Sequence, residues 1–95
     1  MKFLKTFALR TVAGETLLIP TGKTAQEFNG MLTMTETARV MWENYEKVNS
    51  FEEMVNLILD EFEVDEETAR KDVYGFTKSL IQQGILAPTK DDQSW

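Results

Sequence analysis

The sequence contains no cysteine and no histidine. Without cysteine it can form neither disulfides nor thiolate metal ligands, and without histidine it lacks the commonest general base and a common metal ligand. A catalytic centre would have to use carboxylates, Lys, Tyr or Ser alone. Adjacent acids such as Glu52 and Glu53 point about 100° apart on a helix, so they do not converge on one atom. We therefore predict no catalytic residues, no metal and no cofactor.

Long apolar runs are also missing. No segment approaches the roughly 20 residues that a membrane-spanning helix needs. The first ten residues carry two lysines and one arginine, but FALR (7–10) is too short for the apolar centre of a signal peptide. With 42% hydrophobic and 27% charged residues among 95, the composition is that of one ordinary soluble domain. These features predict a cytoplasmic protein without a membrane partner.

The formal charge of −6 is unevenly distributed along the chain. The segment 49–68 contains eight acidic residues and no basic residue. A surface of this sign repels the phosphates that nucleic-acid-binding proteins neutralise with Lys and Arg. It suits a basic peptide or protein partner, or it serves only to maintain solubility.

The first third of the chain has the pattern of strands. FALRTV (7–12) and TLLI (16–19) are rich in β-branched, aliphatic and aromatic residues, and a glycine turn separates them. PTGK (20–23) then interrupts the pattern. A third run, FNGMLTM (28–34), alternates Phe, Gly, Leu and Met with Asn, Met and Thr. We predict a short three-stranded antiparallel sheet at the N-terminus.

The remaining two thirds have helical periodicity. The predicted helices are 35–48, 50–62 and 65–84. Thr35 and Asp65 are the expected N-caps, and Ser50 with Glu53 forms an S-x-x-E capping box. Gly84 is expected to end the last helix.

Three strands followed by three helices place the chain in the α+β class and predict a winged helix-turn-helix architecture. One domain is expected at 1–88, followed by a polar, flexible tail at 89–95. The architecture also admits an alternative function, a winged-helix DNA-binding transcriptional regulator. Arg70, Lys71 and Lys78 of the last helix are opposed by three acids of the same helix. A helix that reads DNA needs several unopposed base and phosphate contacts, so we predict no nucleic-acid partner.

The last helix carries two apolar residues without an obvious contact. At about 100° per residue, Val73, Phe76 and Leu80 form a core stripe, whereas Tyr74 and Ile81 lie to one side. The apolar arc of roughly 160° is wider than the ~100° stripe that a surface helix needs. Either the strands fill the second flank, or a groove remains beside the third strand. That strand has no Lys or Pro to protect its edge, so an extended peptide could add to it.

Three segments of the chain resemble the PqqD family, the recognition elements for ribosomally made, post-translationally modified peptides (RiPPs). They are FNGMLTMTETARVMW (28–42), SFEEMVNLILDEFEVDEETARKDV (50–73) and DVYGFTKSLIQQGIL (72–86). The resemblance covers about residues 5–87. Thr35 and Ala38 depart from the Asn and Gly of the family pattern; Thr still caps a helix and Ala favours one.

The resemblance implies a non-catalytic module that binds the leader segment of a precursor peptide. Members present the leader to a modifying enzyme, often a radical SAM protein, and hold it as a strand added to the third strand, facing the third helix. We expect apolar leader side chains to contact Leu32, Val73, Tyr74, Thr77 and Ile81. Arg70 and Lys78 are expected to pair with leader acids. The backbone groups of Asn29, Met31 and Thr33 are expected to align the added strand.

Two points stay open from the sequence. The acidic second helix could instead serve a protein–protein adaptor, and the same bare edge strand could pair with a second copy in a homodimer.

Overall fold

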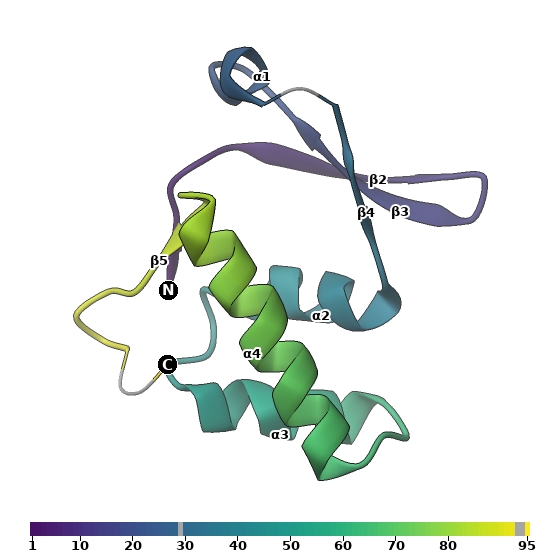
Figure 1. Ribbon diagram of the computed structural model, residues 1–95, viewed down its shortest axis with the longest axis vertical. Helices are drawn as coiled ribbons and strands as arrows, with labels where there is room; N and C mark the ends of the chain where they lie inside the picture. The colour runs from purple at the N-terminus through teal and green to yellow at the C-terminus, as the bar shows by residue number, and fades with distance from the viewer. Residues whose placement is uncertain (29, 93–94) are drawn as a thin grey trace.

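A three-stranded antiparallel sheet lies at one end of a group of three helices (Figure 1). The computed structural model describes residues 1–28, 30–92 and 95. The strands of this sheet are β2 (Phe7–Val12), β3 (Glu15–Pro20) and β4 (Leu32–Met34). Their order is β2-β3-β4, so β3 is central and β4 forms one edge. The α+β class predicted from the sequence is confirmed.

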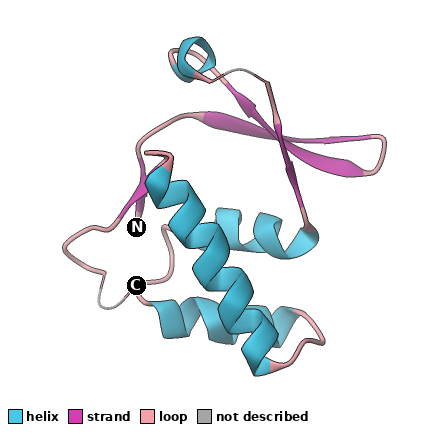
Figure 2. Cartoon of the chain, viewed as in Figure 1, coloured by secondary structure: helices cyan, strands magenta, loops and turns pink. Residues whose placement is uncertain are grey.

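The three long helices follow the sheet along the chain and form the lower layer in Figure 2. They are α2 (Glu36–Asn44), α3 (Phe51–Glu61) and α4 (Glu66–Gln82). The side chains of Thr35, Ser50 and Asp65 each accept a hydrogen bond from the backbone N–H three residues later, at 3.1, 3.1 and 2.8 Å. All three predicted N-caps are therefore confirmed. The hydrogen bonds from Thr68 lower the pKa of the Asp65 carboxyl.

The third strand is shorter than predicted. It was expected at 28–34 but begins at Leu32, and Asn29 lies outside the described residues. A short helix that the sequence did not predict, α1 (Thr24–Glu27), precedes it. Thr24 is buried, and its hydroxyl accepts a hydrogen bond from the Thr6 N–H at 2.9 Å. This contact holds a helical turn against the start of β2.

The two ends of the described chain lie together, which the sequence did not predict. Strands β1 (Lys2–Phe3) and β5 (Leu86–Ala87) pair antiparallel as a second, two-stranded sheet. Strands of two residues are too short to show an alternating pattern, so periodicity could not reveal them. In the tail that was expected to be flexible, the Trp95 ring lies 5.9 Å from the Tyr45 ring.

Two groups of buried side chains form the core. Leu18, Met34 and Ala38 join the sheet to α2. A larger cluster lies among the helices and the chain ends: Met1, Met41, Tyr45, Met54, Val55, Ile58, Ala69, Val73, Leu80, Ile85 and Leu86. Phe76 packs against both groups. It therefore connects the sheet to the helical layer.

One buried hydrogen bond joins α4 to the end of α2. The Tyr45 hydroxyl lies 2.8 Å from the Thr77 hydroxyl, and both residues are buried. Burial raises the pKa of the Tyr45 phenol, so the group stays neutral at any physiological pH.

We expect Tyr45→Phe to lower the free energy of unfolding by about 1–3 kcal/mol, because it leaves the buried Thr77 hydroxyl without this partner. The double variant Tyr45→Phe/Thr77→Val removes both hydroxyls and should recover part of that loss. Urea denaturation of the wild type, the two single variants and the double variant measures the coupling. Strictly additive losses would contradict a direct hydrogen bond.

Candidate functional site

The outer edge of β4 is open. Within the described residues, β4 pairs only with β3, in the register Thr16–Met34, Leu17–Thr33 and Leu18–Leu32. An edge strand directs a row of N–H and C=O groups away from its sheet partner. The edge position expected for this strand is confirmed.

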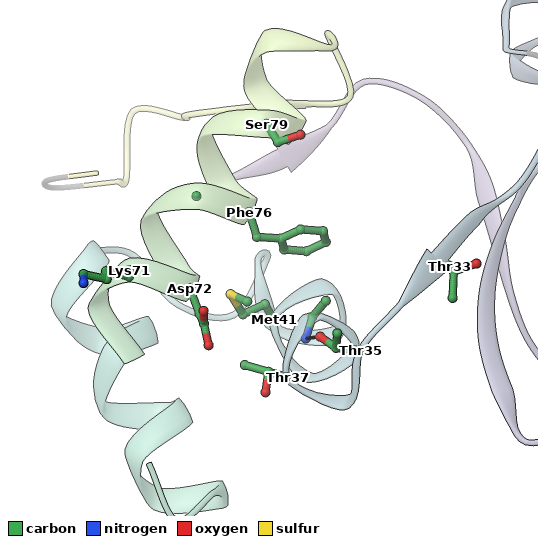
Figure 3. Close-up of a pocket in the computed structure, with 10 residues that line it drawn as sticks. Thr33, Thr35, Thr37, Met41, Lys71, Asp72, Phe76 and Ser79 are labelled. Atoms are coloured by element: carbon green, nitrogen blue, oxygen red, sulfur yellow. Dashed lines mark hydrogen bonds between the residues drawn. The ribbon is translucent and has the colours of Figure 1, made fainter. Parts of the chain in front are cut away.

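A groove of about 540 Å³ lies beside this edge, between β4, α2 and α4. Figure 3 shows Phe76 and Asp72 projecting from α4 toward the first turn of α2, with Thr33 of β4 on the far side. The lining residues are Thr33, Thr35, Thr37, Ala38, Met41, Lys71, Asp72, Gly75, Phe76 and Ser79.

The groove combines an apolar floor with polar walls. Ala38 and Met41 of α2 are buried, and the half-buried ring of Phe76 lies beside them. Hydroxyl groups come from β4, from the start of α2 and from Ser79 of α4. An extended peptide presents both kinds of surface, because its main chain is polar and its side chains can be apolar. The groove can therefore contact both.

Tyr74 and Ile81 do not line the groove beside β4, where they were expected. They line a second pocket of about 260 Å³ on another flank of α4. Its lining residues are Phe51, Tyr74, Thr77, Lys78, Ile81, Gln82 and Trp95. Tyr74 and Ile81 thus share a pocket with Phe51 at the start of α3 and with Trp95, because α4 presents a different flank to β4.

Val73 is a core residue rather than open binding surface, and Thr77 is also buried, although it lines the second pocket. Val73 is 0% exposed, and Thr77 is 5% exposed and bonded to Tyr45. Each was expected to contact a leader side chain. In this structure Val73 is closed to any guest, since α4 turns it toward the other helices.

The two predicted cationic residues also lie away from the groove. Arg70 donates to both carboxylate oxygens of Glu52 at 2.8 Å and to Glu66 at 3.0 Å. The hydrogen bonds to Glu52 and Glu66 raise the pKa of its guanidinium. Lys78 places its ammonium 5.4 Å from the centre of the Tyr74 ring. Arg70 is thus already engaged by two carboxylates of its own chain.

Of the predicted strand residues, Thr33 lines the groove. Met31 and Leu32 precede it with exposed side chains, and Asn29 lies outside the described residues. The groove face of α4 was not predicted from the sequence. A signal was present: Asp72, Gly75 and Ser79 recur at helical spacing as small or polar residues beside Phe76.

The charges of α4 give no support to DNA binding. Arg70 is paired with two glutamates, and Lys71 lies 3.3 Å from Glu67. Basic side chains that are paired with glutamates of the same chain contribute little to phosphate binding.

The described residues contain neither a metal-ion site nor a membrane-spanning helix. In that part of the chain, no group of three or more His, Cys, Asp or Glu side chains is placed to hold a metal ion. Likewise, none of the described helices has the length and apolar character needed to cross a membrane.

Comparisons with known proteins agree on family and fold. A family model described as coenzyme PQQ synthesis protein D (PqqD) matches residues 15–86. No curated protein matches the sequence. A solved structure described as TbiB1 in complex with the TbiA(beta) leader peptide is similar with a TM-score of 0.65 and 20% sequence identity. The alignment covers 94% of this chain and 98% of that chain, so the fold is shared over nearly the whole length.

Proposed function

The chain belongs to the PqqD family, and on this premise we propose that it is a non-catalytic adaptor that binds the leader segment of a ribosomally made precursor peptide. The leader adds to β4 as a further strand and lies in the groove between β4 and α4. One observation carries the proposal: the open edge of β4 faces a groove of about 540 Å³ with an apolar floor. In support, TbiB1, which has the same fold, is described in complex with a leader peptide.

The energetics require side-chain contacts in addition to strand pairing. Micromolar affinity corresponds to about −8 kcal/mol. About five strand hydrogen bonds contribute about 1 kcal/mol each, whereas ordering five peptide residues costs about 1–2 kcal/mol each. Two or three buried apolar side chains, at roughly 1.5–3 kcal/mol each, supply the difference. The half-buried ring of Phe76 is the main apolar surface that we assign to them, because Ala38 and Met41 beside it are almost fully buried.

The adaptor works together with an enzyme that modifies the precursor, and a radical SAM protein fits this role by family resemblance. We place this step in the cytoplasm, where a ribosomal precursor is translated. A homodimer joined through β4 would occupy the same edge. Leader binding and such a dimer are therefore mutually exclusive in this proposal.

Strand addition can be tested with the peptide rather than the protein. Synthetic peptides that tile the products of any short reading frames near the gene of this chain are labelled and titrated by fluorescence anisotropy. The backbone amides of a binding peptide form two alternating sets, and only one set faces β4 in an added strand. N-methylation of the set that faces β4 should abolish binding. N-methylation of the other set should leave binding nearly unchanged. Unchanged affinity after N-methylation of either set of amides would exclude strand addition.

The two flanks of α4 can be compared with a matched pair of variants. Ser79→Leu places a large side chain in the groove, whereas Lys78→Leu places the same side chain at the neighbouring position in the second pocket. We expect Ser79→Leu to weaken binding of the same peptide at least tenfold, about 1.4 kcal/mol, by occluding the groove. Lys78→Leu should change it less than about twofold.

Both residues are exposed, so neither change should disturb the core. Circular dichroism melts of the two variants serve as the control for folding. If Lys78→Leu weakens binding and Ser79→Leu does not, the peptide binds in the pocket of Tyr74 and Ile81.

A further inference from the structure

Gly75 occupies an unfavourable position for a glycine. It lies near the middle of α4, with residues 66–82 in one continuous helix. Glycine is, after proline, the least favourable residue in a helix interior, because its backbone loses the most freedom on folding. A glycine at such a position calls for a reason.

Nothing within the described chain supplies that reason. Gly14, Gly22, Gly30 and Gly84 have positive φ angles, which explains each of them. Gly75 has no such angle, and a Cβ at this position would meet no described atom outside α4 within 4 Å. Neither backbone conformation nor packing against the rest of the structure therefore requires a glycine here.

The groove beside β4 does offer a reason. Gly75 lines it together with Asp72 and Ser79, which lie about one turn away on α4 on either side. Phe76 follows Gly75 and contributes its ring to the floor. Any side chain at position 75 would occupy space in the groove itself. The missing side chain thus keeps part of the groove open at the helix surface.

We propose that Gly75 is a specificity-determining residue that makes room for one large apolar side chain, such as Leu, Ile, Met or Phe, of the bound strand. The inference rests on the proposed function and adds the position and size of one peptide side chain. Apolar chemistry follows from Phe76, whose half-buried ring lines the groove beside the almost fully buried Ala38 and Met41. Thr33, Thr37 and Ser79 line the walls of the groove, where the Ser79 hydroxyl already accepts a hydrogen bond from the Gln83 side chain at 3.0 Å.

The proposal predicts opposite effects on folding and on binding. Gly75→Ala should raise Tm by roughly 4–8 °C, because alanine is a better helix former and meets no clash. The same variant should weaken binding of the best tiled precursor peptide about fivefold or more, since overpacking a fitted contact is unfavourable. Gly75→Leu should weaken it at least about fiftyfold. A residue with a structural role alone would not couple higher stability to weaker binding.

A size exchange identifies the side chain. Each large apolar residue of that peptide is replaced in turn by alanine, and the peptides are titrated against wild type and Gly75→Leu by fluorescence anisotropy. One replacement should weaken binding to wild type yet improve binding to Gly75→Leu relative to the unchanged peptide. Lys78→Leu, which places the same leucine side chain on the other flank, should show no such reversal.

The outcomes separate the two levels of the proposal. If wild type binds none of the tiled peptides, leader binding itself is wrong and the role of Gly75 falls with it. If wild type binds a peptide and both Gly75 variants bind it with unchanged affinity, leader binding stands and the assignment of Gly75 is overturned. Weaker binding by Gly75→Leu without any size reversal would also overturn the assignment of a single side chain.

Discussion

The turn at Thr35 joins the edge strand directly to the helical layer, and the groove depends on it. Thr35 follows the last residue of β4, has extended backbone angles, and caps α2 through the Ala38 N–H. Met34 before it and Ala38 after it are buried in the same cluster with Leu18. Because no linker separates strand from helix, the edge of the sheet is held at a fixed place relative to α2. The third wall, α4, is then placed by its packing on α2 and α3.

Helix α4 has three faces with different tasks. One face, with Ala69, Val73 and Leu80, belongs to the core. A second face lines the groove, and a third, with Tyr74 and Ile81, lines the smaller pocket near α3. The apolar arc is wider than a surface helix requires because it includes Tyr74 and Ile81, which are 58% and 38% exposed at the smaller pocket. The exposed apolar side chains and the open strand edge are therefore separate surfaces, although both involve the same helix.

The charged side chains of the helical layer form ion pairs with one another, and their net negative charge affects which partners can bind. Arg70 connects α4 to α3 through Glu52, and Arg39 pairs with two glutamates of its own helix. Exposed pairs of this kind contribute little to stability. They do neutralise basic side chains, and the net charge of −6 remains. Such a surface disfavours nucleic acids and leaves the recognition of a peptide to the groove.

Local features of the fold could be predicted from the sequence. The N-caps at Thr35, Ser50 and Asp65 and the end of α4 near Gly84 depend on hydrogen bonds and backbone angles within a few residues. The α+β class and the open edge strand followed from the order and composition of the segments. Helical spacing also separated Phe76 from Tyr74 by about 160°, which placed them correctly on different flanks.

Tertiary structure alone decided which neighbour each flank contacts. Periodicity assigns residues to the faces of a helix, but the direction of a face depends on how helices cross and how the chain returns. Tyr74 and Ile81 were therefore assigned to the strand, whereas they line a pocket together with Phe51 and Trp95. The pairing of β1 with β5 brings together residues from opposite ends of the chain. No local pattern encodes such contacts, because they depend on the packing of the whole core.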